Sequence, residues 1–309
     1  MMNKAGVLSL YKPAGMTSHD CVAKLRRLFQ TKKIGHTGTL DPAVTGVLPI
    51  CIGKATKVAQ YMSDYAKAYE AEVTIGFATT TEDQTGETVE EKAVTNSISS
   101  QKIDEVLASF LGEINQTPPM YSAVKVKGRR LYDYARKGEV VDRPSRIVTI
   151  EEINRLGDVQ WNQDKQTLCF RLFVKCSKGT YVRTLAVDIG KKLGFPAHMS
   201  KLQRVSSGPF TLEDCLSFEE IEQMESIEER CQQLKPLEIA IAHIPKYTVT
   251  EELEAKIKVG SVLPQDKFID ENRFTFYNKE GQCLAIYQQH PTKAGLIKPE
   301  KMIWTSLDE

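Results

Sequence analysis

The residues from 35 to 50, GHTGTLDPAVTGVLPI, surround one carboxylate, Asp41, with three glycines, a histidine and two prolines. Pro42 biases Asp41 toward an extended conformation, and the glycines allow tight backbone turns. A rigid loop of this kind is a common place for a catalytic group. An Asp-Pro pair also starts many ordinary turns, so the spacing alone leaves both interpretations open. We therefore treat Asp41 as a candidate for chemistry that needs a fixed carboxylate.

Three other kinds of site were tested against the same stretch. The chain has no G-x-x-x-x-G-K-[ST] run, which excludes a phosphate-binding P-loop. The letters GHTG match the G-x-x-G of a KH domain, but TLDP follows them where a helix is required. His36 and Asp41 alone are too few for a metal centre, so we expect no metal there.

Length and composition limit the class of protein. At 309 residues the chain can form about two domains of ordinary size. Its composition, 41% hydrophobic and 26% charged, is typical of a globular protein, and no apolar run approaches the ~18 residues of a membrane helix. The first residues lack a secretory signal pattern. Seven cysteines are scattered without a C-x-x-C pair, so we expect reduced thiols in a cytoplasmic protein without membrane contact.

The net charge is only +1, but charge is distributed unevenly along the chain. Residues 1–40 carry seven Lys and Arg against one acid, and residues 120–150 carry eight against three. Acids concentrate instead at 211–230, where eight of them meet one Arg. This distribution would allow one positive face to meet a polyanion, although unrelated solvated charges would give the same counts.

Hydrophobic periodicity predicts the elements that position these residues. A strand at 6–12 precedes a helix whose N-cap we assign to Ser18. The same patterns predict further strands at 67–77, 146–159 and 167–177, and further helices at 101–111 and 179–194. After residue 243 short strands with turn signals predominate. We therefore predict an α+β fold with a mixed or antiparallel sheet and a small β-rich C-terminal unit.

Several motifs, in order along the chain, resemble those of one family. Residues 35–42, with Gly46 and the Leu48-Pro49 pair, resemble the catalytic signature of the TruB family of tRNA pseudouridine synthases. Other motifs of that family resemble YKPAGMTS at 11–18, KAYEAEVTIG at 67–76, PPMYSAVKVKGRRLYDYAR at 118–136, CSKGTYVRTLAVDIG at 176–190 and HMSKLQRVSSGPF at 198–210. These matches span most of residues 5–210, and the chain is identified by resemblance as a member of the family.

The resemblance implies a fold and a reaction. The expected fold is a pseudouridine synthase catalytic domain at 1–243, with an RNA-contacting segment at about 115–145, and a PUA-like RNA-binding domain at 244–309. The implied reaction isomerises uridine 55 in the T loop of tRNA. The base is flipped out, its N1 glycosidic bond breaks, and the uracil is rejoined through C5. No water is activated, so one carboxylate suffices where glycosidases use two, and no cofactor is implied.

Three residues carry the implied chemistry. Asp41 either attacks C1′ or removes a proton from C2′, and both roles require its ionised form. Arg183, in GTYVRT, is the implied cation beside it, and a neighbouring cation favours an ionised carboxylate. Tyr69, in KAYEAEV, is implied to stack on the flipped uracil and to help remove the proton from C5.

The resemblance also implies a set of substrate-binding residues. Tyr181 and Leu202 border the uridine, and His36 stacks within the T loop in the space that the extruded base leaves. Asp83 matches an acidic position near the RNA. Lys12 is grouped with these residues, although it is expected to support the catalytic loop more than to contact substrate.

The segment 121–138 is expected to contact the RNA backbone. Cations suit phosphates there, while interleaved tyrosines suit bases or ribose. The cations are Lys125, Lys127, Arg129, Arg130 and Arg136. A solvated amphipathic hairpin would have the same composition. The implied partner is the T stem-loop of tRNA, bound by a monomer without an obligate protein partner.

Two other functions remain open on the sequence alone. One is a non-catalytic RNA-binding or tRNA-folding module that retains the fold. The other is a carboxylate-dependent nucleoside hydrolase, which would need a second acid near Asp41 that no motif supplies. Release of tritium from C5-labelled uridine separates these classes, because only the isomerase releases label without leaving an abasic site.

Overall fold

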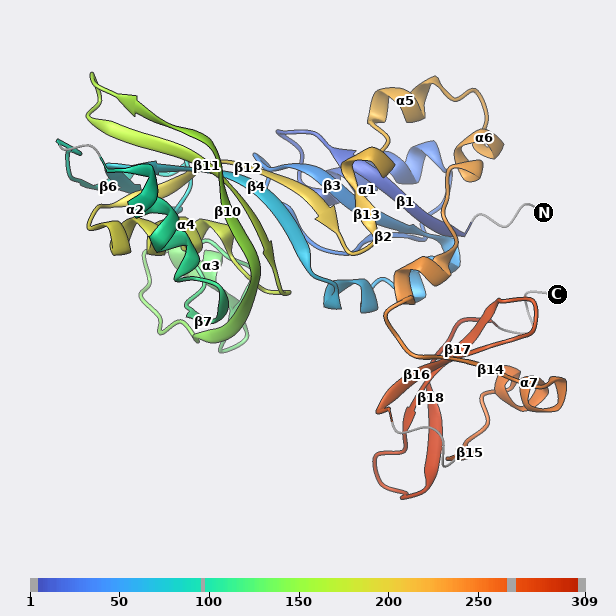
Figure 1. Ribbon diagram of the computed structural model, residues 1–309. Coiled ribbons are helices and arrows are strands. Elements are labelled where there is room, and N and C mark those ends of the chain that lie inside the picture. The colour runs from blue at the N-terminus through green and yellow to red at the C-terminus, as the bar shows by residue number, and fades with distance from the viewer. Residues whose placement is uncertain (1–4, 96–97, 266–270, 305–309) are drawn as a thin grey trace.

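The computed structural model describes residues 5–95, 98–265 and 271–304 (Figure 1). Within these ranges one large sheet comprises β1 (Gly6–Lys12), β2 (Ile34–His36), β3 (Thr45–Ile52), β4 (Lys67–Ile75), β7 (Gly112–Gln116), β10 (Arg146–Asn162), β11 (Thr167–Cys176), β12 (Ala197–Ser207) and β13 (Phe210–Thr211). The strand order is β1-β3-β12-β4-β11-β10-β7, with β2 beside β3 and β13 beside β12. The predicted mixed or antiparallel sheet is confirmed, because in this large sheet, as far as the structure describes it, β3 and β12 pair in parallel and the other neighbours pair antiparallel.

The parallel pair brings the region of the Asp41 loop to the strand that carries Leu202. Gly46 of β3 lies opposite Arg204 of β12. A Cβ at Gly46 would lie 2.2 Å from the backbone oxygen of Arg204, and its φ of +107° is one that side chains rarely adopt. Any other residue at Gly46 would therefore push these two strands apart.

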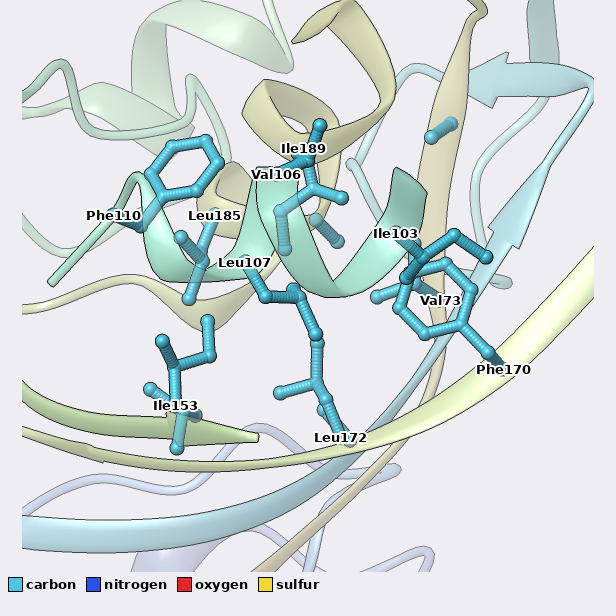
Figure 2. Close-up of a cluster of buried hydrophobic side chains, with 14 of the residues drawn as sticks. Val73, Ile103, Val106, Leu107, Phe110, Ile153, Phe170, Leu172, Leu185 and Ile189 are labelled. Carbon is cyan, nitrogen blue, oxygen red and sulfur yellow. The ribbon is translucent and has the colours of Figure 1, made fainter. Parts of the chain in front are cut away.

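Two helices, α2 (Ser100–Ala108) and α4 (Val182–Leu193), cover one face of the sheet (Figure 1). Figure 2 shows Leu107 of α2 and Leu185 of α4 in one buried cluster with Leu172 of the sheet. Each such side chain contributes about 1.5–3 kcal/mol when it is fully buried. This core fixes α4, and therefore its first turn, against the strands.

Helix α1 (Ser18–Leu28) begins one residue earlier than a Ser18 N-cap would require, since a helix starts at the residue after its N-cap. The N-cap is Thr17, whose side chain accepts a hydrogen bond from the Asp20 N–H, so the assignment of Ser18 was wrong. The Ser18 hydroxyl instead accepts a hydrogen bond from the Leu40 N–H at 2.9 Å. The start of α1 is thereby tied to the loop that carries Asp41.

A second sheet follows from residue 246 onward, in the order β14-β16-β17-β18-β15. It comprises β14 (Lys246–Thr248), β15 (Leu263–Pro264), β16 (Arg273–Tyr277), β17 (Cys283–Gln289) and β18 (Leu296–Met302), with α7 (Glu251–Lys258). Parts of the expected C-terminal unit, 266–270 and 305–309, lie outside the described residues. Ile286 and Ile303 share a buried cluster with Met62 and Ile241, so the two sheets are joined by apolar packing.

Smaller elements complete the described chain. They are the hairpins β5 (Phe77–Thr79) with β6 (Thr88–Glu91) and β8 (Lys125–Val126) with β9 (Arg129–Arg130), the short helices α3 (Leu131–Ala135), α5 (Phe218–Gln223) and α6 (Ile227–Gln232), and the 3₁₀ helices η1 (Gly53–Lys57), η2 (Tyr61–Asp64), η3 (Leu212–Asp214) and η4 (Leu237–Ile241). The seven cysteines are free thiols. No helix among the described residues is long and apolar enough to span a membrane.

Candidate active site

Asp41 lies on the loop between β2 and β3, and backbone hydrogen bonds hold that loop. The Val44 N–H donates to the carbonyl of Asp41 at 3.0 Å, which closes a turn around the aspartate. The Gly15 N–H donates to the carbonyl of Pro42 at 2.9 Å, from the loop that follows β1. The backbone of the aspartate is therefore fixed from both sides, while its side chain remains 43% exposed.

Lys12, which was grouped with the substrate-binding residues but expected mainly to support this loop, is the third contact that holds it. Its residue is wholly buried, and its Nζ donates to the carbonyls of Pro13, Pro42 and Val44 at 2.9, 3.1 and 2.7 Å. A substrate cannot reach a buried ammonium group whose three donors are already engaged. Burial lowers the pKa of Lys12, and the three carbonyls satisfy the charged form. Lys12 therefore holds the loop that carries Asp41.

Arg183 meets Asp41 from the first turn of α4. Its Nη2 lies 3.1 Å from the Asp41 carboxylate, and the arginine side chain is only 7% exposed. The guanidinium is held by two carbonyls: Nη1 donates to Thr81 and Nη2 to Tyr121, each at 3.0 Å. A planar fork fixed in this way presents its charge at a set position. The expected pairing of a cation with Asp41 is therefore present in the geometry.

Asp83 lies on the other side of Arg183. Its carboxylate is 3.8 Å from Nη1 of Arg183, and its side chain is 15% exposed. The Thr81 hydroxyl and the Thr85 N–H donate to the same Asp83 oxygen, at 2.7 and 2.9 Å. In the free protein Asp83 therefore flanks the arginine within a loop held by its own hydrogen bonds. It also lines a smaller hollow of about 180 Å³ that it shares with Asp41 and Leu202.

A pocket of about 320 Å³ opens where these elements meet. Five of the predicted residues line it: Asp41, Tyr69, Tyr181, Arg183 and Leu202. The other lining residues are Thr39, Leu40, Val44, Tyr121, Ser122, Ala123, Tyr132, Thr180 and Val182. The volume falls in the range of about 300–1,000 Å³ typical of small-ligand sites. The pocket has one acid, one guanidinium and several aromatic rings, which suits a flat polar ligand.

Tyr69 of β4 lies directly across from Arg204 of β12, so the two side chains share one face of the sheet. Burial raises the pKa of Tyr69, and the Arg204 guanidinium acts in the opposite direction. The Tyr69 phenol is therefore neutral at neutral pH, as a stacking ring requires. Arg204 itself is 2% exposed, and its Nε donates to the Val47 carbonyl at 2.7 Å. Sequence reasoning did not assign a role to Arg204, although a cation in an alternating buried strand was a usable signal.

His36 is outside the pocket, at the end of β2. Its ring packs edge-to-face on His19 of α1, with centroids 5.4 Å apart. Burial lowers the pKa of His36, with further lowering by His19, so the ring is neutral at neutral pH. Its Nδ1 is buried without a hydrogen-bond partner among the described residues. A neutral ring beside the catalytic loop is compatible with the expected stacking role.

The basic segment forms the hairpin of β8 and β9 with α3, and it supplies part of the pocket wall through Tyr132. Arg130 and Arg136 both pack over the Tyr132 ring, with 5.6 and 5.4 Å to its centroid. Arg129 pairs with Glu139 at 3.0 Å and packs over Tyr134. Arg130 and Arg136 therefore contact a tyrosine that lines the pocket, whereas Lys125 and Lys127 are exposed residues of the hairpin.

The arrangement limits the possible chemistry. Among the described residues Asp41 is the only acid that lines the pocket, whereas hydrolysis by paired carboxylates requires two. In the ranges that the structure describes, no group of three or more His, Cys, Asp or Glu side chains is placed to hold a metal ion. What the pocket offers is a fixed carboxylate beside a fixed cation, facing an aromatic ring.

Solved structures are similar to this chain in overall fold. A chain in the crystal structure of a Cbf5-Nop10-Gar1 complex is 27% identical, with a TM-score of 0.72, and the match covers 97% of this chain and 85% of the other. A chain of an H/ACA RNP bound to a substrate RNA containing 2′-deoxyuridine gives a TM-score of 0.71 at 25% identity, covering 97% and 86%. The sheet, the site and the β-rich C-terminal unit thus define a pseudouridine synthase fold of the Cbf5 and TruB type.

Sequence comparisons identify the family. The model described as "TruB family pseudouridylate synthase (N terminal domain)" matches residues 26–182, and "tRNA pseudouridylate synthase B C-terminal domain" matches 183–242. The tRNA pseudouridine synthase B of Halalkalibacterium halodurans is 60% identical over 303 residues, or 98% of both chains. That of Bacillus subtilis is 51% identical over 305 residues, covering 96% of this chain and 97% of the relative. The chain belongs to the TruB family of pseudouridylate synthases.

Proposed function

We propose that this protein is a tRNA pseudouridine synthase that isomerises uridine 55 in the T loop of tRNA. The observation that carries the proposal is the Asp41–Arg183 pair, 3.1 Å apart, in the pocket that Tyr69 also lines. Relatives that are 51–60% identical over nearly the whole chain bear the name tRNA pseudouridine synthase B. Family and geometry support the same activity through independent observations.

In the proposed reaction the flipped uridine enters the pocket and its base faces Tyr69. Asp41 either attacks C1′, displacing uracil at N1, or removes the C2′ proton while the same bond breaks. The freed uracil turns in place. In the first route C5 then attacks C1′ and displaces the Asp41 carboxylate, and in the second C5 bonds to C1′ of the glycal while Asp41 returns the proton to C2′. The proton on C5 then leaves, and N1 gains a proton, so the product is an isomer. Arg183 balances the charge of Asp41 before the bond breaks and again when the carboxylate is released, because its guanidinium is fixed beside that carboxylate.

We further propose a division of labour along the chain. Residues 1–243 carry the chemistry, with the RNA backbone bound along 115–145, and residues 244–309 form a PUA-like unit that adds RNA affinity. The second sheet begins at Lys246, which supports a boundary near residue 244. The protein would act as a cytoplasmic monomer on the tRNA T stem-loop, without a cofactor or an obligate protein partner.

The experiment is release of tritium from a tRNA transcript that carries C5-labelled uridine. The proposal predicts release of one label per transcript when position 55 is uridine, and none when position 55 is cytidine. The product strand must remain intact under conditions that cleave abasic sites, since an abasic product would indicate a hydrolase. Binding without release would support the non-catalytic RNA-binding module instead.

A further inference from the structure

Gln116, at the end of β7, holds the backbone of Tyr181 on both sides. Its Oε1 accepts a hydrogen bond from the Tyr181 N–H at 2.7 Å, and its Nε2 donates to the Tyr181 carbonyl at 3.0 Å. The residue is 1% exposed. Each end of the side-chain amide therefore has a backbone partner, and RNA cannot reach it in the folded protein.

This contact lies where α4 begins. Tyr181 is the N-cap of α4, yet its side chain makes no capping hydrogen bond. Its carbonyl accepts the first helical bond, from the Leu185 N–H at 3.0 Å, as well as the bond from Gln116. Arg183 follows two residues later in the first turn. Gln116 thus contacts the backbone of the residue at which that turn starts.

A second residue restrains the same tyrosine. Arg146 of β10 is the direct cross-strand partner of Gln116, so both side chains project from one face of the sheet. The Arg146 guanidinium lies 5.0 Å from the centroid of the Tyr181 ring. The ring is therefore held by a cation while the backbone is held by an amide. Tyr181 is thereby attached to β7 and β10, the last two strands at the opposite end of the strand order from β1.

We propose that Gln116 is a positioning residue for the isomerisation, acting through Tyr181 to hold Arg183 against Asp41. This inference rests on the proposed function. Arg183 reaches Asp41 at 3.1 Å from an otherwise buried position, so a shift of the first turn of α4 changes that distance directly. Misplacement of a catalytic group by about 1 Å can lower a rate by about a hundredfold. An amide that fixes the turn therefore contributes to the rate without touching the substrate.

The test compares Gln116→Met with wild type in single turnovers at saturating enzyme, with tRNA affinity measured separately. Methionine keeps the length of the side chain but removes both hydrogen bonds. We expect the rate of label release to fall by about tenfold or more while the Kd for tRNA changes less than about twofold. The matched control is Gln101→Met, on the solvent side of α2, which should leave both quantities unchanged.

A double-variant cycle separates positioning from a general loss of structure. In an Arg183→Lys background the geometry that Gln116 maintains is already lost, so Gln116→Met should cost less than about twofold in rate. An equal loss in both backgrounds, or a wild-type rate for Gln116→Met, would overturn the inference. If the methionine variant does not fold, Gln116→Asn replaces it, because its shorter amide cannot hold both bonds. Absence of label release by the wild type would instead refute the proposed function.

Discussion

The guanidinium of Arg183 lies 3.1 Å from the Asp41 carboxylate, although the arginine side chain is 7% exposed and the aspartate 43%. The cation is held from behind by the carbonyls of Thr81 and Tyr121, and the carboxylate faces the pocket. In this pair the cation is buried, whereas the carboxylate is exposed enough for a substrate to reach it. This asymmetry suits an anion that must act on a substrate while its countercharge stays in place.

Replacement of Asp41 by asparagine should abolish label release and leave tRNA affinity within about tenfold of wild type, because phosphate contacts dominate affinity. The side chain keeps its shape and loses its charge. Single-turnover label release and filter binding measure the two quantities. Turnover by Asp41→Asn would remove Asp41 from its assigned role.

Arg183→Met should lower the single-turnover rate by several orders of magnitude, since the countercharge of Asp41 is lost. Arg183→Lys should recover only part of the rate, because one ammonium cannot contact Asp41 and both carbonyls as the planar fork does. Thermal unfolding must show that both variants are folded. Wild-type rates in both would mean that the ion pair is not used in the reaction.

Asp83→Asn should reduce the rate less than Arg183→Met does. Asp83 is 3.8 Å from the guanidinium, whereas two carbonyls hold Arg183 at 3.0 Å without it. Asparagine can also keep the bonds from Thr81 and Thr85 through its amide oxygen. Rates of both variants in the same assay decide the order, and a greater loss in Asp83→Asn would place Asp83 in the reaction itself.

Lys67 should make stability depend on pH. Burial lowers the pKa of Lys67 to about 8 from 10.5. Between pH 8 and pH 10.5 the unfolded chain binds more protons at Lys67 than the folded protein does. The contribution of Lys67 to the free energy of unfolding therefore rises with pH in this window and does not change with pH below about 8. The free energy of unfolding, measured with urea at several pH values in this window, should rise with pH more steeply for wild type than for Lys67→Met. Lys102→Met, which alters a lysine whose side chain is 59% exposed, should retain the wild-type dependence.

Truncation before Pro245 should lower thermal stability and weaken tRNA binding, while the saturated chemical rate stays nearly unchanged. Met62 and Ile241 lose apolar partners in the second sheet, which lowers the unfolding temperature. Lost phosphate contacts by Lys293, Lys298 and Lys301 would make the affinity difference shrink as salt rises. Single turnovers on the folded truncation test the rate, and its collapse would show that the C-terminal unit shapes the active site.

Local patterns in the sequence predicted the main elements, and motif resemblance predicted the candidate chemistry. Hydrophobic periodicity predicted a strand at 167–177 and a helix at 179–194, close to the observed β11 and α4. This works because an element with one buried face has apolar residues at regular local spacing. Motif resemblance selected Asp41, Tyr69 and Arg183, and these residues do line one pocket.

The contacts that hold those residues in place could be identified only in the folded chain. The Lys12 ammonium group donates to carbonyls of the Asp41 loop, and the Gln116 amide forms hydrogen bonds with the backbone of Tyr181. Arg204 lies across from Tyr69 on the neighbouring strand. Each of these contacts joins segments that are distant in the sequence. Lys12 and Gln116 bond to backbone groups, which are the same whatever side chain the partner residue carries. A local pattern predicts which face of an element is buried, but it does not specify which distant backbone group a buried polar side chain will meet.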